Sequence, residues 1–197
     1  MAETGLLTTA VDRTRFLRPD AAALFQRILL ITDGTVTHLL ETFAGERICV
    51  IKLHQSIDEA TRQVDELEVR DRQQVLHREV LLVGCTTRRA FVYAASKIVP
   101  DRLNPAVRDG LLQSSKPIGY LLEESRTETF RQILEARRES AGACGSYFGI
   151  DAAAEVLTRT YRVLAGGRPI MLITEKFPAD AFLLDGLVSG MDAGPAD

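Results

Sequence analysis

The run Pro169-Ile-Met-Leu-Ile-Thr-Glu-Lys-Phe-Pro178 is an apolar stretch typical of a β-strand, yet it carries one carboxylate, that of Glu175. Side chains alternate between the two faces of a strand, so Glu175 lies on a face whose other members are apolar. These members are Met171, Ile173 and Phe177. Because a lone charge in a low-dielectric interior is costly, the carboxylate must be paired, hydrogen-bonded or protonated. The stretch therefore predicts a core-facing strand whose acidic group needs a partner.

Further strands are predicted on both sides of this one along the chain. The Gly-Gly turn at residues 165–168 joins it to a β-type run at 158–164, which makes a hairpin. Runs at 74–83 and 89–99 are separated by a short turn and predict a second, antiparallel hairpin. A β-branched, apolar run at 46–54 predicts one more strand.

Arg78 is a second charged residue on an apolar strand face, because alternation groups it with Leu76, Val80 and Leu82. Arg78 and Glu175 come from different hairpins and carry opposite charges, which leaves two interpretations open. They could form a buried ion pair that neutralises itself. Alternatively, they could stand at opposite ends of a small closed pocket, where Arg78 holds an anionic group of a ligand and Glu175 acts on its polar end.

Helices are predicted from apolar side chains at helical spacing. They cover residues 21–31, 35–43, a stretch that opens at Asn104-Pro105, and 125–138. The first two meet at the tight corner Thr32-Asp-Gly-Thr35, where free backbone N–H groups could hold a small anion. In the loop 114–119, Gly119 frees the backbone to approach a ligand closely.

Hairpins without βαβ alternation indicate an α+β fold, in which helices cover an antiparallel sheet. At 197 residues with 46% hydrophobic content, the chain can bury one full core and needs only one domain. We expect this domain to span residues 20–178, between a flexible N-terminal segment at 1–19 and a C-terminal tail at 179–197 that frays.

The charge balance argues against nucleic acid or membrane partners. A net charge of -3 supplies no broad basic field for a phosphate backbone or an anionic membrane. No run approaches the roughly 18 apolar residues of a membrane span, and residues 1–18 lack the apolar core of a signal peptide. A cytoplasmic protein is expected, and the oligomeric state stays open.

Metal and disulfide sites are not indicated by the Cys and His spacing. Cys49, Cys85 and Cys144 are scattered and odd in number, so three reduced thiols are expected. The three histidines form no HxH or HExxH pattern, and no metal site is predicted. Glycine patterns for nucleotide binding and the GxSxG elbow of hydrolases are also missing from the sequence.

Four motifs in register resemble the chorismate pyruvate-lyase (4-hydroxybenzoate synthase) family, most of all its actinobacterial branch that makes 4-hydroxybenzoate for glycolipids. The resemblance covers about residues 21–178. The motifs are Thr32-Asp-Gly-Thr-Val-Thr37 with Leu39-Leu-Glu41, Leu76-His-Arg-Glu-Val-Leu-Leu82, Pro117-Ile-Gly-Tyr-Leu-Leu122, and Tyr161-Arg-Val with Gly167-Arg-Pro-Ile-Met-Leu-Ile-Thr-Glu-Lys-Phe-Pro178. The resemblance implies an antiparallel sheet, helical flaps and a ligand site closed to solvent.

The resemblance also implies roles for particular residues. It gives Arg78 the ring carboxylate of the substrate and Glu175 its hydroxyl end. Backbone amides at two further positions, Val36 and Ile118, are implied to help hold the carboxylate.

One departure from the family pattern concerns the second carboxylate of chorismate. Ser96 stands where the ubiquinone-pathway enzyme has a second arginine. The enolpyruvyl carboxylate therefore needs another cation, for which Arg162 and Lys97 are the candidates. Together with Gly119, these two residues complete the predicted substrate-binding set.

The function implied by the resemblance is elimination of pyruvate from chorismate to give 4-hydroxybenzoate, with no metal or organic cofactor. Aromatisation drives the reaction, so the protein need only orient chorismate and stabilise developing charge, and Glu175 could protonate the ether oxygen. Two alternatives stay open. One is a non-catalytic metabolite-binding domain of the same fold. The other is a lyase that acts on a chorismate analogue or gives another hydroxybenzoate isomer.

Overall fold

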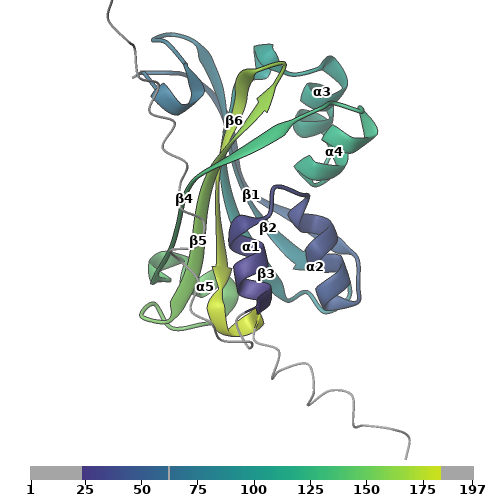
Figure 1. The fold of residues 1–197 in the computed structure, drawn as a ribbon, viewed down its shortest axis with the longest axis vertical. Helices are drawn as coiled ribbons and strands as arrows, with labels where there is room; N and C mark the ends of the chain where they lie inside the picture. The colour runs from purple at the N-terminus through teal and green to yellow at the C-terminus, as the bar shows by residue number, and fades with distance from the viewer. Residues whose placement is uncertain (1–23, 62, 183–197) are drawn as a thin grey trace, which may run out of the picture.

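One antiparallel sheet forms the body of the molecule. The computed structural model describes residues 24–61 and 63–182, and within them six strands pair in the order β1-β2-β3-β6-β5-β4 (Figure 1). The strands are β1 (Ile48–Glu59), β2 (Gln74–Gly84), β3 (Ala90–Ile98), β4 (Phe130–Ser140), β5 (Glu155–Ala165) and β6 (Arg168–Pro178). Antiparallel pairing of β3 with β6 joins two three-stranded meanders into one sheet. The predicted α+β fold with an antiparallel sheet is confirmed.

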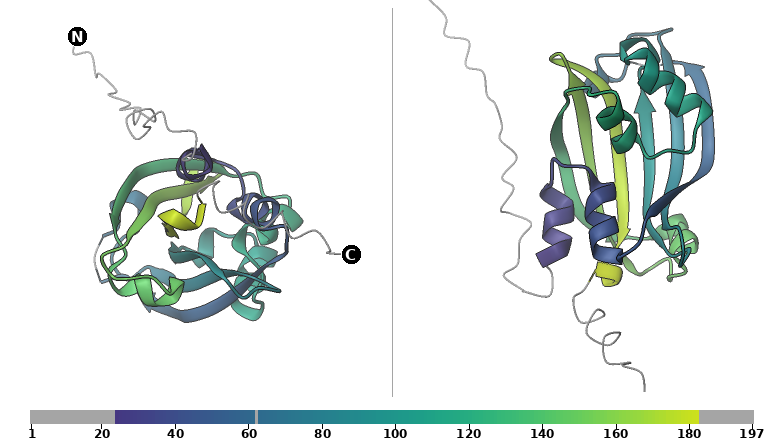
Figure 2. Two further views of the ribbon diagram at one scale, coloured as in Figure 1. Left: turned by 90° about the horizontal axis from the view of Figure 1, so that it is seen from below. Right: turned by 90° about the vertical axis from the view of Figure 1, so that its right-hand side faces the viewer.

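Two pairs of helices cover one face of the curved sheet (Figure 2). The helices are α1 (Leu24–Ile31), α2 (Val36–Ala44), α3 (Pro105–Gln113), α4 (Ile118–Glu124) and α5 (Gly145–Phe148), with short 3-10 helices η2 (Asp65–Leu67), η3 (Pro100–Arg102), η4 (Gly142–Cys144) and η5 (Ala179–Phe182). None of the helices in the described part of the chain is long and apolar enough to cross a membrane.

Each helix pair packs on its own apolar cluster. The cluster at α1–α2 includes the fully buried Leu40 and Phe177, and the cluster at α3–α4 includes the fully buried Leu111 and Met171. Burying a side chain of this size contributes about 1.5–3 kcal/mol. The sheet face is thus divided into two apolar regions, and polar residues can lie between them.

Strand β6 has the orientation predicted for residues 169–178. On β6 the residues 171, 173, 175 and 177 are buried, whereas 172, 174 and 176 are only partly buried. Glu175 is 6% exposed, and so its carboxylate lies in the interior. The predicted core-facing strand with an inward acidic group is confirmed.

The helix predicted at residues 125–138 is wrong for most of its length, because β4 occupies it. Residues on β4 pair with β5 from Phe130 opposite Leu164 to Ser140 opposite Glu155. The apolar residues of this stretch fit either a helix or a strand, and pairing with a neighbouring strand outweighs weak helix propensity. β4 is the edge strand next to β5, and alternate side chains of it face the interior.

The first strand is longer than predicted, and it carries a disulfide. β1 continues past His54 to Glu59 because its outer half pairs with β2 up to Gln74. Cys49 on β1 is bonded to Cys85, with Cα atoms 5.1 Å apart. The expectation of reduced thiols is therefore wrong for this pair, since strand pairing closes a sequence separation of 36 residues.

The predicted tail begins four residues too early. Residues 179–182 form η5, and Phe182 is 0% exposed because its ring packs among Phe25, Phe43 and Phe177. Aromatic contacts of this kind keep the segment on the α1–α2 cluster. The segments 1–19 and 183–197 lie outside the described residues.

Candidate active site

A pocket lies between the two apolar clusters, under the helix pairs. It encloses about 590 Å³ of space between atoms, its open mouth included. Strand residues form its floor, and residues 34–37 and 117–119 form its roof. On the central strand β3 the floor consists of Ala94 and Ser96, whose small side chains leave room above the sheet.

Arg78 and Glu175 stand on opposite sides of this floor. Across the sheet, Arg78 is level with Ser96 on β3 and with Ile173 on β6. Glu175 is level with Ala94, one step of two residues away. Two inter-strand spacings and one such step place the two Cα atoms about 12 Å apart. The side chains therefore approach the same small space from its two sides.

Arg78 is a buried cation with few partners. Its side chain is 1% exposed, its Nη2 donates to Lys116 O at 3.4 Å, and its Nε has no hydrogen-bond partner among the described residues. Burial lowers the pKa of Arg78 to about 10, so the guanidinium keeps its charge at pH 7. A planar, charged donor group with unused N–H groups is suited to bind a carboxylate.

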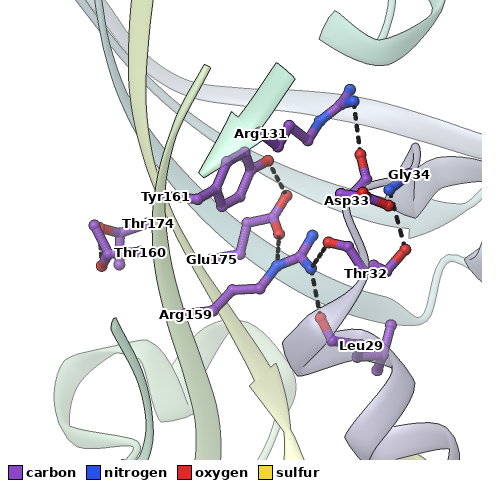
Figure 3. A network of polar contacts seen from close by, with 10 residues as sticks. All are labelled: Leu29, Thr32, Asp33, Gly34, Arg131, Arg159, Thr160, Tyr161, Thr174 and Glu175. Atoms are coloured by element: carbon purple, nitrogen blue, oxygen red, sulfur yellow. Dashed lines mark hydrogen bonds and ion pairs between the residues drawn. The ribbon is translucent and has the colours of Figure 1, made fainter. Parts of the chain in front are cut away.

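Glu175 has its partners on β5, the strand next to it (Figure 3). Arg159 Nε donates to Glu175 Oε2 at 2.7 Å, and Tyr161 Oη donates to Glu175 Oε1 at 3.0 Å. Burial and the charge of Glu175 raise the pKa of Tyr161, so that its phenol stays a donor at neutral pH. The interpretation of Arg78 and Glu175 as a self-neutralising ion pair is wrong, because Arg159 is the ion-pair partner of Glu175.

Arg159 connects the site to the end of a helix. Its guanidinium is 1% exposed, and Nη1 donates to Leu29 O at 2.6 Å and to Thr32 O at 2.9 Å. The last carbonyl groups of a helix receive no hydrogen bond from within the helix, and a cation near them is favourable. The same side chain thus holds Glu175 on one side and the C-terminal end of α1 on the other (Figure 3).

The roof of the pocket brings two helix starts together. Val36 is the first residue of α2 and Ile118 the first residue of α4, and both line the pocket. Thr35, at the N-cap of α2, makes no capping hydrogen bond through its side chain. The first N–H groups of a helix lack an intrahelical acceptor, which leaves them available to a ligand. The role of Val36 and Ile118 in substrate binding stays a prediction.

Gly119 allows α4 to approach α2 closely, because a Cβ atom at this position would overlap the side chain of Thr35. Next to it, Tyr120 Oη donates to Glu41 Oε2 at 2.5 Å, and the ring of His38 lies 5.1 Å from that of Tyr120. We call this contact, formed by Thr35, His38, Glu41, Gly119 and Tyr120, the α2–α4 seam. Gly119 lines the pocket as well as the seam.

Replacement of Gly119 by Ala is expected to lower the free energy of unfolding by about 1–3 kcal/mol, because the added methyl group overpacks the seam. Urea denaturation measures the loss. A matched double variant, Gly119→Ala with Thr35→Ala, should recover most of it, since the Thr35 side chain makes no cap hydrogen bond. A single variant as stable as the wild type would contradict the close contact at the seam.

Two of the predicted substrate-binding residues lie on the wrong face of the sheet. Lys97 is exposed and is level with His77 and Leu172, on the face away from the helix pairs. Arg162 donates from Nε to Gln132 Oε1 at 2.7 Å on that same outer face. Neither residue lines the pocket. Their assignment to the substrate is wrong, because each is one residue away from an inward-facing position and alternation turns it outward.

Two arginines of the site were not found from the sequence. Arg159 shares its strand face with Tyr161 and Val163, and alternation applied to residues 155–165 would have placed it inward. Arg131 lines the pocket from β4, and the incorrect helix assignment concealed its orientation. Alternation in the sequence is enough to predict the inward orientation of Arg159. For Arg131 it must also be known that residues 130–140 form a strand.

The fold and the site together define a class of protein. The pocket places a buried guanidinium with unused N–H groups across from a carboxylate, an arrangement suited to a small anionic molecule that has a polar group at its far end. Among the described residues, no group of three or more His, Cys, Asp or Glu side chains is placed to hold a metal ion. The chain is an α+β domain whose fold is also seen in the effector domain of PhnF from Mycobacterium smegmatis. The two share 17% sequence identity with a TM-score of 0.58, over 77% of this chain and 92% of that chain.

Sequence comparison identifies the family. The family described as "Chorismate pyruvate-lyase Rv2949c-like" matches residues 30–183, and the chain belongs to it. Relatives named chorismate pyruvate-lyase include one from Mycobacterium leprae, 32% identical over 79% of this chain and 75% of the relative. Another, from Mycobacterium tuberculosis, is 31% identical over 79% of this chain and 80% of the relative. The resemblance noted from the four motifs is confirmed.

Proposed function

We propose that the protein eliminates pyruvate from chorismate to give 4-hydroxybenzoate. The observation that carries the proposal is the placement of Arg78 and Glu175 on opposite sides of one small pocket. Chorismate is a ring with a carboxylate at one end and a hydroxyl group at the other. A cation and a hydrogen-bond acceptor about 12 Å apart at their Cα atoms match these two ends.

The ring carboxylate binds Arg78 in this proposal. The buried guanidinium offers its unpartnered Nε, and the N–H groups at Val36 and Ile118 lie at the roof of the same pocket. Because water is largely excluded there, a charge-assisted contact is stronger than at the surface. This end of the pocket fixes the ring and its direction.

The hydroxyl end binds Glu175 in this proposal. Its ion pair with Arg159 holds the carboxylate in place, so that Glu175 can accept a hydrogen bond from the ring hydroxyl. Proton donation from Glu175 to the ether oxygen stays a hypothesis from the sequence. Each carboxylate oxygen accepts one bond from the protein, from Arg159 or Tyr161, and a second lone pair stays available.

The chemical step needs orientation more than acid catalysis. The ring carbon that bears the hydroxyl group loses its hydrogen, and the neighbouring carbon–oxygen bond of the enolpyruvyl ether breaks. The new ring double bond completes the aromatic system. The enolpyruvyl methylene gains a hydrogen and becomes the methyl group of pyruvate, so atoms balance without an added reductant or oxidant. Holding both ends of the ring keeps the reacting groups close together, which is the main contribution of the protein.

The test is incubation of purified protein with chorismate. Pyruvate is measured by reduction with lactate dehydrogenase, and the aromatic product is identified by NMR and mass spectrometry. Equal amounts of pyruvate and 4-hydroxybenzoate are expected. Chorismate that binds without turnover would instead indicate a binding protein of this fold. Another hydroxybenzoate isomer, or turnover of the 4-amino analogue alone, would replace the proposed substrate or product.

A further inference from the structure

A second cation lines the pocket and has no part in the proposed binding of the ring carboxylate and the hydroxyl group. Of the described residues that line the pocket, Arg78 and Arg131 carry positive charge and Glu175 carries negative charge. Chorismate has two carboxylates, one on the ring and one on the enolpyruvyl group. If Arg78 binds the ring carboxylate, the second carboxylate is left without a cation, and burying an unpaired charge is costly.

The register of β4 explains why Arg131 faces the pocket. Arg131 is level with Val163 on β5, and directly paired residues of antiparallel strands point to the same face. Val163 is buried and lines the pocket. The next residue, Gln132, bonds Arg162 on the outer face, as alternation requires. The inward direction of Arg131 is therefore fixed by the strand and not by a chance side-chain conformation.

The guanidinium of Arg131 is positioned but not saturated. Its Nη1 donates to Asp33 O at 2.9 Å, at the corner between α1 and α2 (Figure 3). A guanidinium has five N–H groups, so four are left for other acceptors. Unlike Arg159, Arg131 forms no salt bridge with a carboxylate in the described part of the chain. Arg131 thus presents a fixed positive charge with free donors to the pocket.

Arg131 lies at the end of the pocket where Glu175 is. Arg131 donates to Asp33 O, and the adjacent carbonyl, Thr32 O, accepts from Arg159, the residue that holds Glu175. In chorismate the enolpyruvyl ether is attached to the ring carbon next to the one that bears the hydroxyl group. When the hydroxyl group binds Glu175, the second carboxylate must lie at this same end.

We propose that Arg131 binds the enolpyruvyl carboxylate of chorismate and so distinguishes substrate from product. The inference rests on the proposed function, and it assigns to β4 the role for which Arg162 and Lys97 were candidates. The product 4-hydroxybenzoate lacks this carboxylate, which leaves with pyruvate. Arg131 therefore adds affinity for the dianionic substrate and none for the aromatic product.

The experiment compares two ligands on matched variants. Dissociation constants for chorismate and for 4-hydroxybenzoate are measured by titration calorimetry at low temperature, and KM by the pyruvate assay. Arg131→Gln should weaken chorismate binding and raise KM about 10- to 100-fold, whereas binding of 4-hydroxybenzoate should change less than about threefold. Arg131→Lys should recover part of the chorismate affinity, because it restores the charge but not the planar donor group. Arg162→Gln, on the outer face of the neighbouring strand, is the control and should leave both ligands unaffected.

The outcomes separate this inference from the proposed function. Unchanged chorismate binding in Arg131→Gln, or equal losses for both ligands, would overturn the role of Arg131 alone. Wild-type protein that binds chorismate without turnover would overturn the proposed reaction, and the comparison of the two ligands would still test Arg131. Wild-type protein that does not bind chorismate would overturn both. Thermal unfolding of each variant shows whether it is folded, and Arg131→Lys supplies the test if Arg131→Gln is not.

Discussion

Replacement of Arg159 by Ala is expected to lower the free energy of unfolding by about 3–5 kcal/mol. The substitution removes the ion-pair partner of Glu175, whose carboxylate would stay buried without a compensating charge. It also removes the hydrogen bonds to Leu29 O and Thr32 O at the end of α1. At about 2–4 °C per kcal/mol for a chain of this size, Tm should fall by about 6–20 °C.

Differential scanning calorimetry measures this change, with Arg162→Ala as the matched control. Arg162 lies three residues further along β5 on the outer face, where it is partly exposed and bonds a neutral amide. Its loss should stay below about 1 kcal/mol. An Arg159→Ala protein within 1 kcal/mol of the control would show that Glu175 is not stabilised by Arg159. In the proposed reaction, Arg159 is a positioning residue, because it contacts Glu175 and does not line the pocket.

Replacement of Arg78 by Met is expected to have opposite effects on stability and on binding. Burial lowers the pKa of Arg78 from 12.5 to about 10. Below pH 10 the group is charged in both the folded and the unfolded chain, so the full cost of burying the charge is present at pH 7. That cost is on the order of 3 kcal/mol and would be relieved only as the pH rises through 10. A neutral side chain of similar length should therefore leave the ligand-free protein as stable as the wild type, or more stable by about 1–3 kcal/mol.

The same variant should bind ligand poorly. Loss of a buried, hydrogen-bonded partner of a carboxylate costs about 2–5 kcal/mol, so Kd for 4-hydroxybenzoate should rise about 30-fold or more. Urea denaturation without ligand and calorimetric titration with 4-hydroxybenzoate check the two halves of this prediction. If Arg78→Met instead destabilised the empty protein by several kcal/mol, Arg78 would be a structural residue. Unchanged binding would remove it from the substrate site.

The sequence predicted the two strands that carry the site because each has a charged residue on an apolar face. For Arg78 and Glu175, alternation alone identified an inward orientation, and the structure confirms it. What lies between them could not be predicted in the same way. It depends on which strands are neighbours, and the pairing of β3 with β6 joins residues that are between 73 (Ile98 and Met171) and 83 (Tyr93 and Lys176) positions apart. The partner of Glu175 was also hidden, since any of several arginines could have been adjacent to it.

The errors share one physical cause. Local patterns do not record long-range pairing, which decides between helix and strand for residues 130–140 and brings Cys49 to Cys85. An Ile-Leu-Glu-Ala run fits a helix until β5 offers it a hydrogen-bonded neighbour. The misplacement of Lys97 and Arg162 is of another kind, because strict alternation would have excluded both from the start.

The α2–α4 seam has a consequence for how molecules enter and leave. The buried guanidinium of Arg159 holds α1 to the sheet. Moving α1 away would break this hydrogen bond and expose the buried ion pair between Arg159 and Glu175. At the seam, by contrast, the bonds of Tyr120 to Glu41 and of His38 to Glu123 lie near the surface, where water can replace them. Opening along the seam therefore requires the smaller free energy. We infer that a ligand enters and leaves the pocket along the seam, next to the first residues of α2 and α4.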